Sequence, residues 1–104
     1  MNEADLVAVA HALGDGRRFA VLCEIAAGGE LSCGEVAERV GVSQPTASHH
    51  LRVLGEAGLV EVRHVAQRSL FRTAGDRLEA FLVALRELLG PRNGLPDLGD
   101  GVID

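Results

Sequence analysis

Residues 41–54, Gly-Val-Ser-Gln-Pro-Thr-Ala-Ser-His-His-Leu-Arg-Val-Leu, constrain the fold of this chain more than any other stretch. Ser43 is a typical N-cap, and Pro45 fits the first turn of a helix, where its missing N–H removes no hydrogen bond. Because a helix turns by about 100° per residue, three apolar residues share one inward stripe, namely Ala47, Leu51 and Leu54. The stretch predicts a turn followed by an amphipathic helix from residue 44.

The outward face of this predicted helix carries residues that a face exposed only to solvent seldom has. Small hydroxyls, an imidazole and a guanidinium replace the usual Glu and Lys, at Ser48, His49 and Arg52. Short donors and acceptors can approach base edges in the major groove of DNA, and an arginine can reach phosphate or guanine. The face therefore indicates a helix that contacts DNA.

Helical spacing of apolar residues extends to both sides of this stretch. It predicts helices over residues 3–13, 17–27 and 76–89. A further helix begins at the capping box Ser32-x-x-Glu35 and ends at Gly41. Together with the helix from residue 44 it forms a helix-turn-helix, whose second helix enters the major groove. The helix over 17–27 is expected to bury one stripe, made of Phe19, Leu22, Cys23 and Ala26.

A period of two replaces the helical period after Gly58. Residues 59–64 and 69–73 alternate apolar and polar side chains, and a polar turn near Ala66 separates them. This pattern predicts a two-stranded hairpin, which beside a recognition helix is called a wing. Four polar residues are expected near its tip, where the phosphate backbone or the minor groove runs: Arg63, His64, Gln67 and Arg68.

The last predicted helix has an apolar stripe too wide for a helix with one exposed side. The stripe contains Leu78, Phe81, Leu82, Leu85, Leu88 and Leu89. We expect it to pack against a second copy of the chain beside the first helix, since a small domain gains stability from such an interface. The sequence thus predicts a DNA-binding and dimerisation domain over 1–89 and a Gly/Pro/Asp-rich tail over 90–104.

The net charge of −5 is unusual for a DNA-binding protein, but the charge is unevenly distributed. Residues 43–72 contain four arginines against two acidic residues, a local balance of +2. A locally basic face can bind DNA with strong salt dependence. No apolar run approaches the roughly 20 residues of a membrane span. The acidic N-terminus lacks the pattern of a signal peptide, so we expect a cytoplasmic protein.

Four motifs occur in order: Leu13-Gly14-Asp15-Gly16-Arg17-Arg18, Glu30-Leu31-Ser32, Glu35-Val36-Ala37, and Ser43-Gln44-Pro45-x-x-Ser48-x-His50-Leu51-x-x-Leu54. In these motifs and their order, the chain resembles transcriptional regulators of the ArsR/SmtB type over about residues 6–89. The resemblance implies a mainly α winged helix-turn-helix with elements in the order ααααββα and a homodimer through the first and fifth helices. Each recognition helix would contact one half of a palindromic operator. Such regulators are usually repressors released by a metal ion, a metalloid or a thiol oxidant.

The same resemblance implies which residues contact the DNA operator. Base contacts would fall on Gln44, Thr46, Ser48 and His49, and phosphate contacts on Arg52 and Arg68. With the N-cap and the wing tip, the full set of expected DNA-binding residues is Ser43, Gln44, Thr46, Ser48, His49, Arg52, Arg63, Gln67 and Arg68.

The sensor sites known from ArsR/SmtB-type regulators are incomplete in this chain. An arsenic-type site needs cysteines where this chain has Ser32 and Gly34, with Cys33 between them. A zinc/nickel-type site needs ligands at both ends of the last helix, where the chain offers Asp76 and then Leu78, Leu89 and Arg92. A dithiol site matches at Cys23, but its second cysteine would lie near Leu89. The effector therefore stays open among a metal, an oxidant and a partner protein.

The two cysteines, Cys23 and Cys33, form no disulfide framework. Packing in the core is the expected role of Cys23. Cys33 lies at a helix N-terminus, where the dipole lowers a thiol pKa and favours reactivity. An inert cysteine in place of an apolar residue is the favoured interpretation of Cys33, and the reactive one stays open.

Three other functions compete with that of a DNA-binding regulator. A nickel or zinc site could join His11 to Asp5, Asp76 or Glu79 between the first and last helices. A winged helix could also dock on another protein without contacting DNA. An enzyme is the least favoured class, because no catalytic arrangement occurs outside the recognition helix and no phosphate-binding glycine loop is present. No cofactor is expected.

Overall fold

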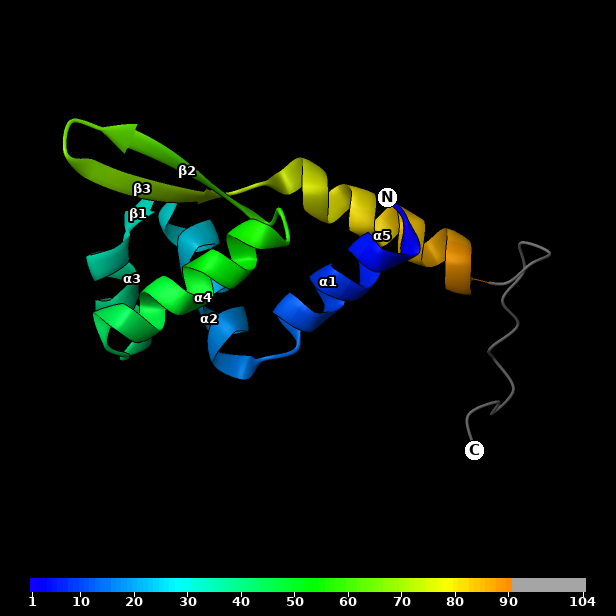
Figure 1. Ribbon diagram of the computed structural model, residues 1–104, viewed down its shortest axis with the longest axis horizontal. Helices are drawn as coiled ribbons and strands as arrows, with labels where there is room; N and C mark the ends of the chain where they lie inside the picture. The colour runs from blue at the N-terminus through cyan, green and yellow to red at the C-terminus, as the bar shows by residue number, and fades with distance from the viewer. Residues whose placement is uncertain (91–104) are drawn as a thin grey trace.

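The computed structural model describes residues 1–90, so the expected tail lies almost wholly outside the described residues. The described helices are α1 (Glu3–Leu13), α2 (Gly16–Gly28), α3 (Cys33–Val40), α4 (Gln44–Glu56) and α5 (Gly75–Leu89). The strands are β1 (Leu31–Ser32), β2 (Val60–Val65) and β3 (Arg68–Thr73). In Figure 1 the β2–β3 hairpin projects at one end of an elongated molecule, and α1 lies against α5 at the other end. The mainly helical winged helix-turn-helix is confirmed.

Side-chain caps define the starts of α1 to α4, and the sequence predicts those at Ser32 and Ser43. The Asn2 side chain accepts a hydrogen bond from the backbone N–H of Asp5 at 2.8 Å, and a reciprocal bond completes a capping box. Ser32 and Glu35 form the capping box of α3. Ser43 accepts from the backbone N–H of Thr46 at the start of α4. Such caps stabilise a helix by about 1 kcal/mol each and fix where it begins.

The core lies between α2, α3 and α4, with α1 against it. Its largest fully buried side chains are Ile25, Leu54, Leu59, Val9, Val21 and Val36. The inward stripe expected on α4 is confirmed, because Ala47, Leu51 and Leu54 are all buried. No helix among residues 1–90 combines the length and the apolar character needed to cross a membrane.

The buried stripe expected on α2 is wrong. Val21 and Ile25 are fully buried, whereas Phe19 and Cys23 are exposed. The reason is the neighbouring Arg18, which is only 6% exposed. Its Nε donates to the carbonyl of Ala12 at 2.8 Å and its Nη2 to the carbonyl of His11 at 3.1 Å. The guanidinium thus satisfies two carbonyls at the end of α1, where helix ends lack partners, and fixes the face of α2 that is buried.

The sheet has a third strand that the sequence analysis missed. Strand order is β1-β3-β2, and all pairs are antiparallel. In β1, Leu31 pairs with Phe71 and Ser32 with Leu70. A strand of two residues has no period to detect, so only tertiary pairing reveals it. The fold is therefore corrected from a hairpin to a three-stranded sheet, in which the edge strand β2 and the central strand β3 form the wing.

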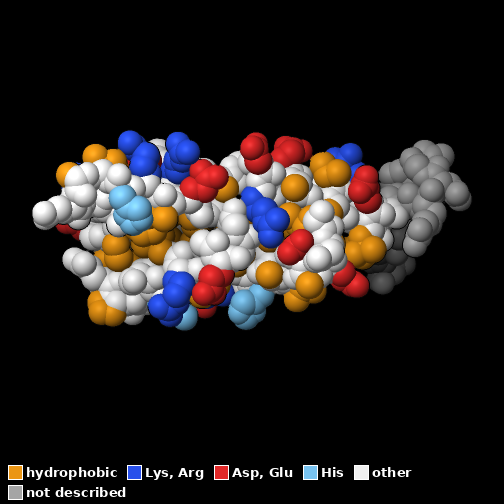
Figure 2. All heavy atoms as spheres, turned by 45° about the horizontal axis from the view of Figure 1, so that its top comes forward, with side chains coloured by type: hydrophobic (Ala, Val, Ile, Leu, Met, Phe, Trp, Pro, Cys, Tyr) orange, Lys and Arg blue, Asp and Glu red, His pale blue; other side chains and the backbone are white. Residues whose placement is uncertain are grey.

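The apolar stripe of α5 is largely exposed in the single chain. Phe81 is buried, but Leu82 is 50% exposed, Leu88 49% and Leu89 72%. On α1, Val7 is 63% exposed. Figure 2 shows hydrophobic side chains scattered over the end of the molecule opposite the wing. A monomer that exposes this much leucine on one helix favours the interface expected from the sequence.

Candidate DNA interface

The polar face of α4 points outward. Its expected DNA-contacting residues are all exposed: Ser43, Gln44, Thr46, Ser48, His49 and Arg52. The Ser43 hydroxyl also lies 3.0 Å from the Thr46 hydroxyl and donates to it, which orients both side chains at the helix start. Because the opposite face of α4 is buried in the core, the helix presents these groups on a rigid support.

Arg52 fixes the orientation of the His49 ring. Its Nη2 lies 3.0 Å from Nδ1 of His49. A guanidinium can only donate, so Nδ1 accepts the hydrogen bond and the proton of the neutral ring is on Nε2. His49 therefore offers an outward N–H donor, which matches acceptors such as N7 and O6 of guanine in the major groove.

His50, the next residue, has a different role because it is only 7% exposed. Its ring packs in the core, and its Nδ1 has no hydrogen-bond partner among the described residues. Burial lowers the pKa of His50, and the nearby positive charges of Arg18 and Arg17 and the His49 ring lower it further, against the attraction of Asp15. Folding therefore favours the neutral imidazole.

This burial predicts that the protein loses stability in mild acid. Because the pKa of His50 is lower in the folded than in the unfolded chain, the unfolded chain takes up a proton first as the pH falls below about 6.5. The stability that the neutral His50 contributes is fully present above that pH. It is lost as the pH falls through the pKa that His50 has in the folded chain. Urea denaturation at about pH 7.5 and about pH 5.5 measures this loss.

His50→Gln is expected to show a smaller difference between the two pH values than the parent chain. His11→Ala, which replaces an exposed histidine on α1, is the matched control and should keep the parental difference. An unchanged difference in His50→Gln would show that another group causes the pH dependence.

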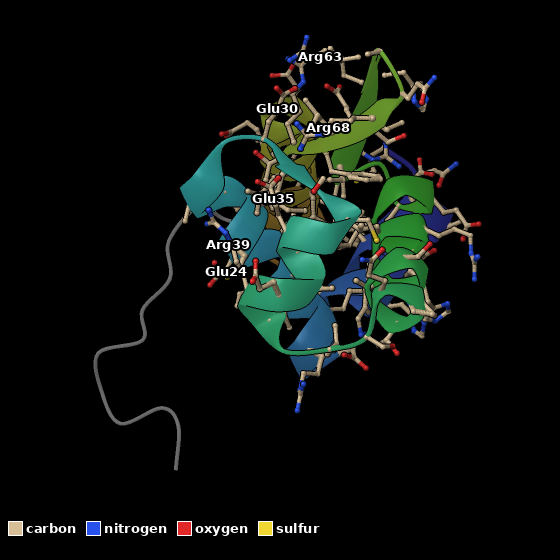
Figure 3. All side chains as sticks on the ribbon, turned by 90° about the vertical axis from the view of Figure 1, so that its left-hand side faces the viewer. Glu24, Glu30, Glu35, Arg39, Arg63 and Arg68 are labelled. Atoms are coloured by element: carbon tan, nitrogen blue, oxygen red, sulfur yellow. The ribbon has the colours of Figure 1, made fainter. Side chains whose placement is uncertain are left out.

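The wing arginines are engaged in ion pairs. Arg63 donates two hydrogen bonds to the carboxylate of Glu30, at 2.9 Å from Nε and 2.6 Å from Nη2. These bonds hold the pKa of Glu30 below its ordinary value. Arg68 lies 3.8 Å from Glu35 of α3. Figure 3 shows both labelled pairs beside the sheet and α3, to the left of α4. Gln67 is exposed in the turn, next to Ala66 with its φ of 56°.

The two faces of the wing differ. Paired residues of an antiparallel ladder share a face, and successive residues alternate between faces. Arg63 pairs with Leu70, so it lies on the opposite face from His64, which pairs with Ser69. Nδ1 of His64 lies 3.0 Å from Oγ of Ser69. The sequence placed His64 near the tip but missed Ser69, because this pairing depends on the register of the hairpin.

A groove of about 290 Å³ separates α4 from the wing. Ser48, Leu51, Arg52 and Gly55 of α4 line one side, and Val60, Val62 and Phe71 of the sheet line the other, with Cys33 between them. Figure 2 shows hydrophobic side chains gathered in a hollow at the wing end of the molecule. The groove therefore combines an apolar floor with polar groups from the recognition helix.

Both cysteines differ from expectation in part. Cys23 is exposed rather than packed in the core, and it borders an apolar pocket of about 260 Å³ with Phe19 and Leu78. Burial raises the pKa of Cys33, so the expected lowering by the helix dipole is wrong. A thiol with a raised pKa is a poorer nucleophile, which supports the inert interpretation of Cys33.

Within residues 1–90 the structure brings together no group of three or more His, Cys, Asp and Glu side chains that could hold a metal ion. Asp5, a ligand of the alternative nickel or zinc site, lies 3.7 Å from Arg77 of α5. A single described chain therefore does not assemble that alternative site between the first and last helices.

A capped helix with an exposed polar face, beside a projecting hairpin, defines a winged helix-turn-helix DNA-binding domain. Comparison with known families agrees, since a helix-turn-helix domain family matches residues 13–63. The Bacillus subtilis protein YceK, an uncharacterized HTH-type transcriptional regulator, is 35% identical over 79 residues, which cover 75% of this chain and 79% of YceK.

Two other relatives have named activities. The transcriptional activator HlyU of Vibrio cholerae is 33% identical over 87 residues, 84% of this chain and 80% of HlyU. The biofilm growth-associated repressor of Agrobacterium fabrum is 38% identical over 68 residues, 65% of this chain and 57% of the repressor. The similar proteins thus include both an activator and a repressor.

Solved structures give the same result. An ArsR-like transcriptional regulator from Rhodococcus sp. RHA1 superposes with a TM-score of 0.76 at 30% identity, covering 82% of this chain and 79% of that one. A homodimeric winged helix-turn-helix DNA-binding domain from Mycobacterium bovis, a possible ArsR-family regulator, gives 0.68 at 30% identity, with the same two coverages. The chain belongs to the ArsR/SmtB family of winged helix-turn-helix transcriptional regulators, and it is a DNA-binding regulator of that type.

Proposed function

We propose that the chain acts as a homodimer that binds a palindromic operator and represses transcription. The observation that carries this proposal is the exposed polar face of α4, anchored by a buried apolar face and capped at Ser43. Two such helices, about one DNA turn apart, match the two halves of a palindrome. The exposed leucines of α5 supply the surface that would join the two copies.

The proposed contacts divide into base and phosphate contacts. Gln44, Thr46, Ser48 and His49 would approach base edges, because they are exposed on the first turns of α4. Phosphate contacts are proposed for Ser43 at the helix start, Arg52 on α4, and Gln67 and Arg68 at the wing tip. Arg63, also expected to contact DNA, is bound to Glu30.

Repression is proposed because a protein that only occupies an operator blocks transcription. Occupancy needs one surface for DNA and one for a second copy of the chain. The exposed polar face of α4 and the exposed leucines of α5 support these two roles. The repressor from Agrobacterium fabrum supports this choice, whereas the activator from Vibrio cholerae shows that similar proteins can act in the opposite direction. A reporter gene placed behind the operator distinguishes them, since deletion of a repressor raises expression.

His49→Ala is expected to weaken operator binding by about 1–3 kcal/mol, the usual cost of a lost base contact. This corresponds to a rise in Kd of roughly 5- to 150-fold. Fluorescence anisotropy with DNA from upstream of the protein's own gene measures the change, and excess unrelated DNA measures specificity. His11→Ala removes an exposed histidine from α1 and should leave the Kd unchanged. Equal Kd values for both variants would contradict the proposed contact face.

A further inference from the structure

We propose that one DNA backbone strand lies in the groove between α4 and the wing, where the His64–Ser69 pair contacts its phosphate and Arg63 acts only as a brace for the wing. The inference rests on the proposed operator binding and reassigns the contacts that the wing makes. It concerns the face of the hairpin that the sequence pattern could not identify.

The strand register decides which wing residues face the groove. Val62 pairs with Phe71, and both line the groove opposite Ser48 and Arg52. His64 lies two residues beyond Val62 on the same strand, so its side chain shares the face of Val62, about 7 Å nearer the tip. Arg63 and its partner Leu70 belong to the other face. The histidine, and not the arginine, therefore continues the wall of the groove.

The groove has the chemistry of a sugar-phosphate backbone. Its floor is apolar, with Leu51, Val62 and Phe71, and suits the hydrophobic face of a deoxyribose. Arg52 and Ser48 border it on the α4 side and can pair with phosphate oxygens. The surrounding segment, residues 43–72, carries a positive charge balance of +2. Charge and shape thus favour a nucleic-acid strand over an uncharged apolar partner.

The His64–Ser69 pair is arranged to hold one phosphate from the wing side. The hydrogen bond of 3.0 Å between Nδ1 and Oγ fixes the ring plane of His64. It leaves Nε2 for a second partner, and both side chains come from opposed positions on β2 and β3. When the Ser69 hydroxyl donates to Nδ1, the proton of the neutral ring is on Nε2, which can donate to a phosphate oxygen. A histidine held in this way orders fewer rotatable bonds on binding than a long arginine side chain.

Arg63 is held away from this site by its bidentate bond to Glu30. Glu30 immediately precedes β1, so the pair connects the outer strand β2 across β3 to the segment after α2. Figure 3 shows the labelled pair at the edge of the wing, away from α4. The Arg63 guanidinium is already paired with a carboxylate of opposite charge. The pair sets the position of the wing relative to the segment between α2 and β1.

The contact role of His64 can be tested with synthetic operators that carry one uncharged methylphosphonate at successive backbone positions. His64→Ala in the full chain is expected to raise the Kd for unmodified operator about tenfold, the cost of losing one hydrogen bond to a charged group. At one backbone position, the methylphosphonate should weaken the parent protein but have no further effect on His64→Ala. Additive effects at every position would overturn the contact.

The brace role of Arg63 can be tested by salt titration of the same binding reaction. Arg63→Ala and Glu30→Gln are expected to raise the Kd for operator by similar factors. The double variant should raise the Kd no more than either single variant does. All three variants should keep the parental dependence of the Kd on salt concentration. If Arg63 instead contacts phosphate, Arg63→Ala lowers the salt slope by about one and Glu30→Gln tightens binding, which overturns the brace. Arg72→Ala is the matched control, because it removes an arginine from the same face, paired with Glu61 at 3.2 Å.

The outcomes separate this inference from the proposed function. If the parent protein shows no preference for operator over unrelated DNA, operator binding itself fails. If the parent binds specifically and His49→Ala weakens it, but His64→Ala has the parental Kd, only the assignment of the wing contact fails.

Discussion

Leu82→Glu is expected to convert the proposed dimer into monomers and to raise its dissociation constant at least about 100-fold, or about 2.8 kcal/mol. Leu82 is 50% exposed in the single chain and lies in the middle of the stripe on α5. A carboxylate at this position would have to lose its hydration without gaining a partner when two copies associate. Sedimentation velocity over a range of protein concentrations measures the shift.

The loss of the dimer should also weaken operator binding, because a monomer contacts only one half-site. Ala80→Glu is the matched control: it puts the same charge on an exposed position of α5, at the opposite side of the helix from Leu82. Circular dichroism should show that both variants keep the parental helix content. A dimeric Leu82→Glu protein would contradict the interface through α5.

Ile25→Ala is expected to lower the free energy of unfolding by about 2–5 kcal/mol, the usual cost of truncating a buried aliphatic side chain. Ile25 has no exposed surface and lies among the core residues of α2 and its neighbours. The loss combines the transfer free energy of the removed methyl groups with the cost of the cavity that remains. Urea denaturation at one fixed protein concentration measures it.

Cys23→Ala, two residues away on the same helix, is the matched control. Because Cys23 is exposed, the free energy of unfolding should change by no more than about 0.5 kcal/mol. A large loss for Cys23→Ala together with a small loss for Ile25→Ala would restore the buried stripe that the sequence pattern favoured.

The sequence predicted α4 correctly because several independent signals agree there. The cap at Ser43, the first-turn Pro45 and the spacing of the buried Ala47, Leu51 and Leu54 all specify one helix and one inward face. Local sequence is sufficient where the cap and the apolar period determine the structure together.

The errors occur where tertiary contacts decide. Apolar residues surround α2 on several sides, and the buried hydrogen bonds of Arg18 to α1 select the inward face. The strand β1 exists only through its pairing with Leu70 and Phe71. On the wing, the DNA contact of Arg63 stays a prediction, and the structure adds what local sequence does not contain, namely the strand register and the pair of Arg63 with Glu30.

The strand order β1-β3-β2 leaves one edge of β2 unpaired within the described sheet. An open edge rich in valine can add a strand from another molecule and so begin aggregation. Charged side chains oppose this, because Glu61 and Arg63 are interspersed with Val60, Val62 and Val65 along β2. The pair of Arg63 with Glu30 then has a second consequence: it holds a charged side chain in a fixed position on this edge strand, where it opposes the addition of a strand from another copy.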